Sequence, residues 1–293
     1  MYHCVRMIEE EAERAATVTE MEREAVASVP ETKRTLIEDG SEAIAMLIRR
    51  GFSPSMSALD LPFRLDHPQL SRIEVELHRY AFRIFLRGAI QHREGYLPIE
   101  VSRFLPPPTA VEIAERLVAL ELSTVLDDGR HRLKKIPDSF GSTLEWYVAR
   151  SLRRELAVDA RAAVKFHAPG VGGDLDVVLA AEGKLIAIEL KSSPPKYLHD
   201  QEMRAFVERT RMLRPDVAIF AIDSALRMTD KVVPMLIAAV KHVSGKARVP
   251  VRIERDIWGI SPHVYVVNAK PDLISNIVRA IAEGFRALSP PPL

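Results

Sequence analysis

Residues 173–193, GDLDVVLAAEGKLIAIELKSS, predict a β-hairpin at the centre of the fold. The two apolar runs are rich in Val, Ile and Leu, and each has the length of a strand. Between them stands the Glu182-Gly183 pair, a signal for a tight turn. We therefore expect two neighbouring antiparallel strands joined by a short turn.

The hairpin would carry a cluster of charged side chains on one side. Because alternate residues of a strand share a face, Asp174 and Asp176 point the same way, as do Glu189 and Lys191. Carboxylate oxygens are the ligands that Mg²⁺ prefers, and a nearby lysine can orient or deprotonate an attacking water or neutralise a transition state. This pattern predicts a metal site for phosphodiester hydrolysis, with Asp176, Asp174 or both supplying the aspartate ligand.

The flanking sequence predicts an α/β domain around this hairpin. Residues 142–157 form an amphipathic pattern with Ser142 as a candidate N-cap and Glu145 in the first turn. A strand at 162–168 precedes the hairpin, and a helix from His199 and a strand at 217–223 follow it. The remaining pattern predicts helices at 228–243 and 271–288, with strands and a loop between them.

In these residues the chain resembles the PD-(D/E)xK nuclease superfamily, which includes restriction endonucleases. Position by position, Glu145 matches the helix carboxylate, Asp176 the hairpin aspartate, and Glu189 and Lys191 the E-x-K pair, while Gln201 stands where many members keep a glutamine. The resemblance covers roughly residues 138–225. It implies a restriction-endonuclease-like mixed central sheet flanked by helices, a Mg²⁺ or Mn²⁺ cofactor, a DNA substrate and a homodimer.

The N-terminal half predicts mainly helices. We expect a helical arm over residues 1–58, with helices on both sides of Pro30, the second of which stops at Gly51. Residues 52–70 have no clear period and predict a linker or an extended arm. Over residues 59–137 the order helix, helix, helix and hairpin resembles a winged helix-turn-helix, with Thr109 as an N-cap and Asp128-Gly129 as the hairpin turn. The nuclease-like domain would then span residues 138–293.

Basic residues mark two candidate surfaces for nucleic acid. The third helix of the winged-helix-like module carries three glutamates against a single arginine, so its wing is the better DNA contact, with Arg130 and Arg132 as the candidates. Alternatively, the module packs against the nuclease-like domain or mediates dimerisation. The second surface follows the E-x-K pair and comprises Lys196, Gln201, Arg204, Arg209, Arg211 and Arg214. The alternative is a helical face that is exposed to solvent and binds nothing.

Composition narrows the functional classes. The single cysteine, Cys4, excludes an internal disulfide framework and cysteine-rich zinc sites. No apolar run has the length of a membrane span and the N-terminus is acidic, so we expect a cytoplasmic protein without membrane contact. Scarce Asn and Gln beside abundant charge are a tendency of thermophiles. Residues 135–293 hold 23 basic and 18 acidic residues, a net charge of +5 that is compatible with a polyanionic partner.

Two other classes of function stay open. The chain lacks a phosphate-cradling G-x-x-x-x-G-K-[ST] loop, a G-x-S-x-G elbow and an H-E-x-x-H motif. Besides a nuclease, the sequence is compatible with a non-catalytic DNA-binding or regulatory protein that keeps a nuclease-like fold. An assembly protein whose helical arm and winged module bind protein partners is the third interpretation.

Overall fold

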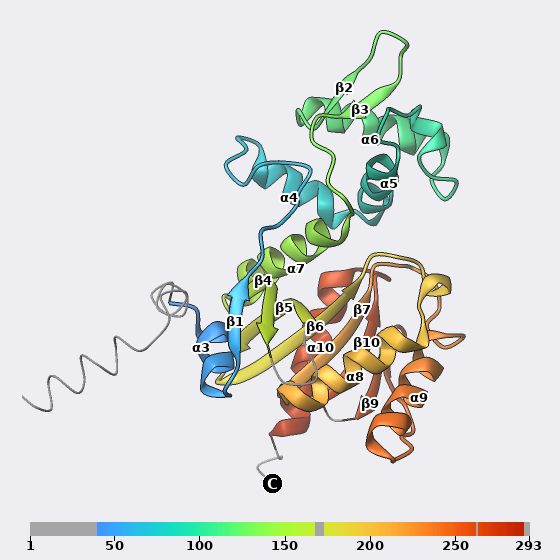
Figure 1. Ribbon diagram of the computed structural model, residues 1–293. Helices are drawn as coiled ribbons and strands as arrows, with labels where there is room; N and C mark the ends of the chain where they lie inside the picture. The colour runs from blue at the N-terminus through green and yellow to red at the C-terminus, as the bar shows by residue number, and fades with distance from the viewer. Residues whose placement is uncertain (1–39, 168–172, 262, 290–293) are drawn as a thin grey trace, which may run out of the picture.

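The computed structural model describes residues 40–167, 173–261 and 263–289 (Figure 1). Most of the expected helical arm lies outside these residues. In chain order the elements are α3 (Glu42–Arg49), β1 (Ser53–Met56), α4 (Leu70–His78), α5 (Tyr80–Gln91), η1 (Pro98–Glu100), α6 (Pro107–Ala119), β2 (Ser123–Val125), β3 (His131–Leu133), α7 (Gly141–Leu156), β4 (Asp159–His167), β5 (Gly173–Ala181), β6 (Lys184–Lys191), η2 (Pro195–Tyr197), α8 (Asp200–Leu213), β7 (Val217–Ile222), α9 (Val232–Ser244), β8 (Val251–Glu254), β9 (Ile257–Ser261), β10 (Val264–Asn268) and α10 (Leu273–Leu288).

An eight-stranded mixed sheet forms the centre of the fold. Its strand order is β1-β4-β5-β6-β7-β10-β9-β8. The β6–β7 and β7–β10 pairs are parallel and the other pairs are antiparallel. The predicted hairpin is confirmed as β5 and β6, and its turn residues Glu182 and Gly183 both adopt positive φ angles, of 51° and 70°. A mixed α/β fold with a sheet flanked by helices is therefore confirmed.

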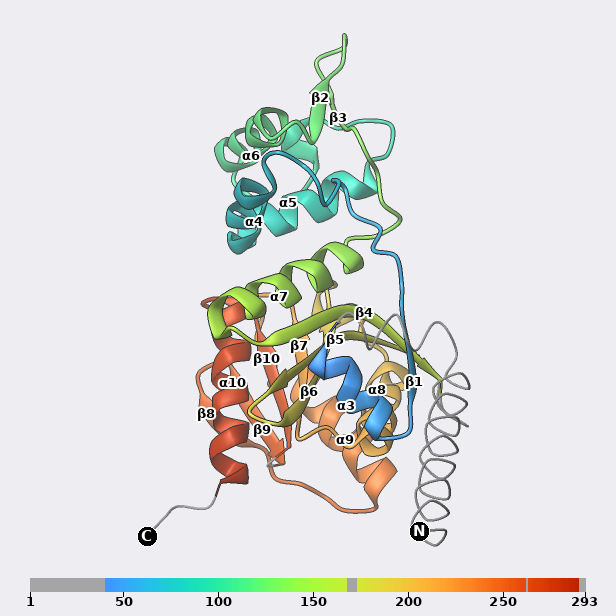
Figure 2. The same cartoon turned by 90° about the vertical axis from the view of Figure 1, so that its left-hand side faces the viewer.

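Helices cover both faces of this sheet (Figure 2). One core cluster joins α7 and α10 to one face, and two further clusters join α3, α8 and α9 to the other. All six residues of β7, VAIFAI, are buried because this strand is covered on both sides. None of the helices in the described part of the chain combines the length and apolar character that crossing a bilayer requires.

The prediction of a linker or extended arm over residues 52–70 is wrong at its start. Residues 53–56 form β1, which pairs antiparallel with β4 and makes an edge of the sheet. Pro54 has no backbone N–H to donate, and an edge strand tolerates this because one of its sides needs no partner. The preceding helix α3 begins at Glu42, capped by the side chain of Ser41, and packs on the sheet as well. The end of the expected arm is thus part of the sheet structure.

Residues 70–133, which we call the helical unit, contain three helices and the two-stranded β2–β3 sheet in the predicted order. The helical pattern from Ser71 is divided, because Arg79 adopts an extended conformation between α4 and α5. The prediction of Thr109 as an N-cap is wrong, since α6 already begins at Pro107. Proline suits the first turn of a helix, where its missing N–H is not needed. The winged-helix identity of this unit stays a prediction.

The helical unit packs against the rest of the chain. A single apolar cluster runs from α4, α5 and α6 through α7 to the sheet. At its centre Arg83 of α5 and Asp223, which follows β7, are each 1% exposed and are joined by hydrogen bonds of 2.9 to 3.1 Å. Arg83 also donates Nη1 to the carbonyl oxygens of Leu77 and His78, at 2.6 and 3.0 Å. This buried pair links the two parts of the chain.

A second polar link joins α4 to α7. Glu74, 3% exposed, accepts a hydrogen bond from Arg150 Nε and another from Arg154 Nη1, both at 2.6 Å. The helical unit therefore packs against α7 and the sheet, as one of the expected alternatives has it.

Candidate active site

Strand β6 brings Glu189 and Lys191 together. Glu189 is 8% exposed, and its Oε1 lies 3.0 Å from Lys191 Nζ. Lys191 Nζ also lies 3.3 Å from Oε1 of Glu202 on α8. The E-x-K spacing thus places an ion pair at the carboxyl end of β6, under helix α8.

Arg209 on α8 holds the other oxygen of Glu189. Its Nη2 donates to Glu189 Oε2 at 2.6 Å, and its side chain is 16% exposed. The prediction that Arg209 faces a DNA backbone is therefore wrong. Arg209 lies seven residues after Glu202, or two helical turns, so both side chains project from the face of α8 that meets the sheet. The sequence carries this spacing, but it does not reveal that the partner carboxylate of Arg209 comes from β6.

Asp176 joins the cluster from β5. The β5–β6 register places it opposite Glu189, and its Oδ2 accepts the backbone N–H of Leu190 at 2.6 Å. Burial, followed by the negative charges of Glu189 and Glu145, raises the pKa of Asp176 well above its ordinary value. Asp176 is therefore a poorly solvated carboxyl group close to two others.

Glu145 approaches from α7, where it is half-buried. Burial, followed by the charges of Asp174 and Glu189, raises the pKa of Glu145 to about 7. Asp174 is exposed at the rim of the cluster. The prediction of Ser142 as the helix cap is wrong, since α7 begins at Gly141 after Phe140. The structure nevertheless brings Glu145, Asp176 and Glu189 close to Lys191, with Asp174 near Glu145.

The environment of Lys191 keeps its ammonium charged. Burial by itself would lower the pKa of Lys191, but Glu189, Asp176 and Glu202 together outweigh burial and raise it. A lysine of raised pKa does not remove a proton from water at neutral pH. Of the roles expected for Lys191, orienting a water and stabilising negative charge fit this environment.

The carboxylates of the cluster are of the kind that binds a divalent cation, but they do not surround a common position for one. Within the described ranges, no three Asp, Glu, His or Cys side chains are arranged to hold a metal ion. Both oxygens of Glu189 face cations, from Lys191 and from Arg209. Burial, followed by the charges of neighbouring carboxylates, raises the pKa values of Glu145 and Asp176, and a bound Mg²⁺ or Mn²⁺ would offset the cost of ionising such donors. Metal binding therefore requires that Glu189 exchange a cationic partner for the ion.

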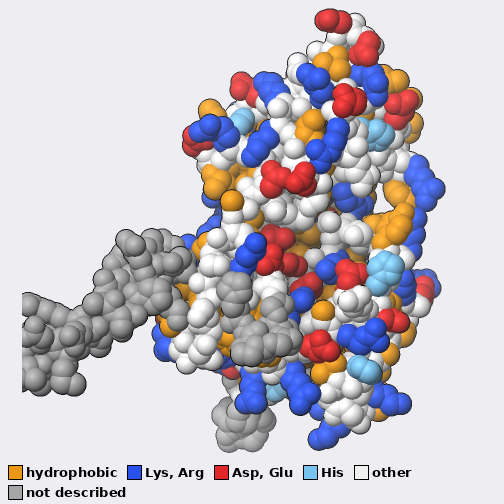
Figure 3. Space-filling view, viewed as in Figure 1, with side chains coloured by type: hydrophobic (Ala, Val, Ile, Leu, Met, Phe, Trp, Pro, Cys, Tyr) orange, Lys and Arg blue, Asp and Glu red, His pale blue; other side chains and the backbone are white. Residues whose placement is uncertain are grey.

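The predicted nucleic-acid residues fall into two separate groups. Lys196, Gln201 and Arg204 are exposed around the start of α8, where Lys196 Nζ lies 4.5 Å from the centre of the Tyr197 ring. Arg130 and Arg132 lie on the β2–β3 hairpin, at the opposite end of the helical unit (Figures 1 and 2). In the space-filling view, acidic side chains gather at mid-height, between the helical unit and the sheet (Figure 3).

Comparisons with known proteins give a distant likeness only. No protein-family model matches the chain, and no curated protein does. Among solved structures, the chain is similar to protein VC1899 from Vibrio cholerae, at 15% identity and a TM-score of 0.45, over 82% of this chain and 61% of that one. It is also similar to Can2 from Sulfobacillus thermosulfidooxidans in complex with cyclic tetra-adenylate, at 15% identity and a TM-score of 0.44, over 81% and 59% of the two chains. The chain thus spans about three fifths of each protein, and we base the functional proposal on the residues of the site.

Proposed function

We propose that this protein is a metal-dependent nuclease of the PD-(D/E)xK type that hydrolyses phosphodiester bonds of DNA. Glu145, Asp176 and Glu189 hold Mg²⁺ or Mn²⁺, and Asp174 is a further candidate ligand at the rim. The observation that carries the proposal is the convergence of these carboxylates from α7, β5 and β6 on Lys191.

The residues divide the chemistry between them. Bound Mg²⁺ or Mn²⁺ activates water at neutral pH and offsets negative charge on the scissile phosphate. Lys191, charged at neutral pH, orients the attacking water and stabilises the charge that develops on the phosphate. Arg209 holds Glu189 in place and supplies a second positive charge at the same carboxylate.

A cleavage assay tests the proposal. Labelled duplex, branched and single-stranded DNA are incubated with Mg²⁺ or Mn²⁺ and the wild type, Glu189→Gln or Lys191→Ala. We expect the wild type to cut and each variant to lose about 100-fold or more in rate, as for loss of a residue that stabilises transition-state charge. Glu208→Gln is the matched control, because Glu208 is exposed on the same helix as Arg209. Unchanged cutting by both variants, or no cutting by the wild type, would contradict the proposal.

A non-catalytic DNA-binding or regulatory protein is the second candidate. The observation that favours it is the full occupation of Glu189 by Lys191 and Arg209, which forms a closed ion-pair network. Calorimetric titration with Mg²⁺ and Mn²⁺ separates the two functions. A nuclease binds the ion and loses that binding in Glu189→Gln, whereas the second candidate binds DNA with no metal at this cluster.

The expected homodimer is a further part of the proposal. Many nucleases of this type act as dimers with two active sites. Light scattering of the eluting peak in size-exclusion chromatography measures the molecular mass directly, and a monomer at all concentrations would contradict this part.

A further inference from the structure

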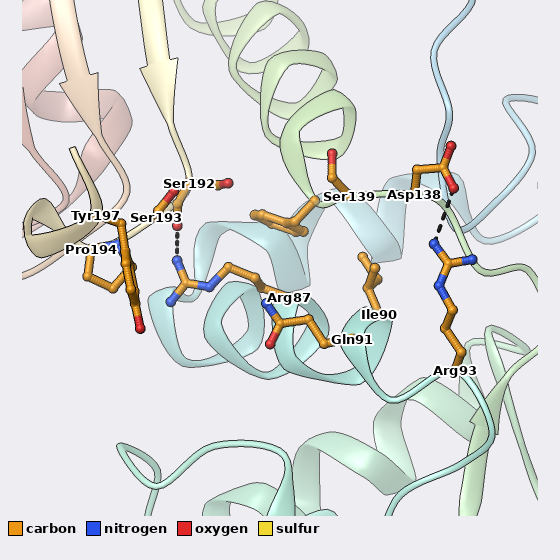
Figure 4. A pocket seen from close by; sticks show the side chains of 11 residues that line it. Arg87, Ile90, Gln91, Arg93, Asp138, Ser139, Ser192, Ser193, Pro194 and Tyr197 are labelled. Carbon is orange, nitrogen blue, oxygen red and sulfur yellow. Dashed lines mark hydrogen bonds and ion pairs between the residues drawn. The ribbon is translucent and has the colours of Figure 1, made fainter. Parts of the chain in front are cut away.

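A cleft beside the catalytic cluster separates α5 from the sheet. Its volume is about 350 Å³, and its walls come from α5, from the turn that precedes α7 and from the loop after β6. In Figure 4 Arg87 of α5 reaches the loop after β6, to which a dashed line joins it, while Gln91 lies beside Arg87 and Ser139 lies on another side of the space. We call it the α5 cleft.

The α5 cleft begins where the catalytic cluster ends. Ser192 and Ser193 directly follow Lys191 in the chain, so the same loop borders both features. On the other side, Ser139 precedes Gly141, and a Cβ atom at Gly141 would lie 3.8 Å from Glu145 Oε1. A nucleic-acid strand with its phosphate at Lys191 would therefore place its neighbouring nucleotide at this cleft.

The side chains of the cleft suit a nucleotide. Arg87 Nη1 donates to the carbonyl oxygen of Ser192, which fixes the guanidinium at the cleft wall. The three serine hydroxyls and the Gln91 amide can donate to and accept from phosphate, sugar or base. Among the residues that the structure describes, two arginines and one carboxylate line the cleft. The carboxylate, Asp138, pairs with Arg93 at 3.2 Å, so the positive charge of Arg87 is not balanced by a carboxylate among these lining residues. Such a wall attracts an anion.

Tyr197 adds an aromatic surface. Its side chain lines the cleft and is 57% exposed. A hydrogen bond from Lys196, together with the charges of Lys196 and Arg103, lowers the pKa of Tyr197, so cations from both the α8 side and the helical unit lie near this ring. Exposed aromatic rings among basic residues are the usual platform on which unpaired bases stack.

The volume of the α5 cleft indicates which form of nucleic acid it can hold. Pockets of about 300–1,000 Å³ hold single small ligands, and a duplex, whose major groove alone is about 12 Å wide, does not enter such a space. We propose that the α5 cleft binds one unpaired nucleotide next to the scissile phosphate, with Tyr197 stacking on its base and Arg87 contacting its phosphate, so that the substrate is a single-stranded nucleic acid. This inference rests on the proposed nuclease function, and it gives the helical unit a part in substrate binding.

Binding without turnover tests the cleft. Fluorescence anisotropy of labelled single-stranded and duplex oligonucleotides is measured on the full chain in EDTA. We expect the wild type to prefer the single strand and Tyr197→Ala to weaken that binding about tenfold, the usual effect of losing one stacked base. Leu65→Ala, at 59% exposure, is the control for removing an exposed apolar side chain and is expected to bind as the wild type does. Gln91→Trp, which fills the cleft from the α5 side, is expected to weaken single-strand binding with an unchanged melting temperature.

The outcomes separate this inference from the proposed function. If the wild type cuts DNA but neither variant changes single-strand affinity or KM, the cleft inference fails while the nuclease stands. Preferred binding of duplex also overturns it. If the wild type does not cut but both variants lose single-strand affinity, the cleft binds nucleic acid and the nuclease proposal fails. Ribose and deoxyribose oligonucleotides compared in the same assay identify the sugar.

Discussion

Replacing Asp223 with alanine is expected to be one of the most destabilising single changes in this chain. Arg83 and Asp223 are each 1% exposed, and Asp223 accepts hydrogen bonds from both Nε and Nη2 of the guanidinium. Without the carboxylate, Arg83 keeps its hydrogen bonds to the carbonyl oxygens of Leu77 and His78 and its contacts with two tyrosine rings, but it becomes a buried charge without its anionic partner. Breaking such a pair from one side costs about 3–5 kcal/mol.

Urea denaturation followed by circular dichroism measures this loss. The control is Asp66→Asn, because Asp66 pairs with Arg64 in an equally direct contact of 2.8 Å on the exposed surface, and its loss should leave the unfolding midpoint unchanged. In the double variant Arg83→Met, Asp223→Leu both charges of this pair are removed, so part of the stability that Asp223→Ala loses should return. A loss below about 1 kcal/mol in Asp223→Ala, or a double variant worse than the single one, would refute the reasoning.

Three further predictions concern single side chains. Because the folded protein raises the pKa of Glu145 from 4.5 to about 7, ionisation destabilises the fold as pH rises through this range. In the absence of metal, the free energy of unfolding of Glu145→Gln should therefore exceed that of the wild type by about 2–3 kcal/mol at about pH 8, and the two should be equal at about pH 4. Urea denaturation curves that coincide at both pH values would refute this prediction. Arg209→Leu frees Glu189 Oε2 and should tighten Mg²⁺ binding in calorimetry, while weaker binding would show that Arg209 does not compete with the ion. Gly88→Ala should cost about 1–3 kcal/mol in urea denaturation, because its Cβ would lie 2.6 Å from Val101 Cγ1 and press on the Val101 carbonyl; an unchanged midpoint would mean that α5 moves freely.

The hairpin and its charged residues were predictable from local pattern. The apolar runs of β5 and β6 have the length of strands and are buried along most of it, and the Glu182-Gly183 turn fixes their register, which brings Asp176 and Glu189 to the same end of the hairpin. Helix α7 followed from its apolar period, which also placed Glu145 near the sheet. The identities of these residues as metal ligands stay predictions.

Strand β1 and the role of Arg209 were not predicted, for two different reasons. β1 has four residues and no apolar alternation, and its partner β4 lies more than a hundred residues later, so no local signal marks the pairing. Arg209 was placed on a nucleic-acid surface because arginines usually are exposed. Its burial depends on a carboxylate from β6, and only the tertiary structure brings that partner to α8.

The helical unit is an insertion between two adjacent strands of one sheet. The chain leaves the sheet after β1, builds the helical unit and returns through residues 134–140 into α7 and β4, the neighbour of β1. Such an insertion is held by two chain connections, and here one apolar cluster and the buried Arg83–Asp223 pair also hold it against the sheet. The returning connection runs directly into α7, the helix that carries Glu145. One wall of the α5 cleft and the position of the Glu145 carboxylate therefore depend on the same stretch of chain.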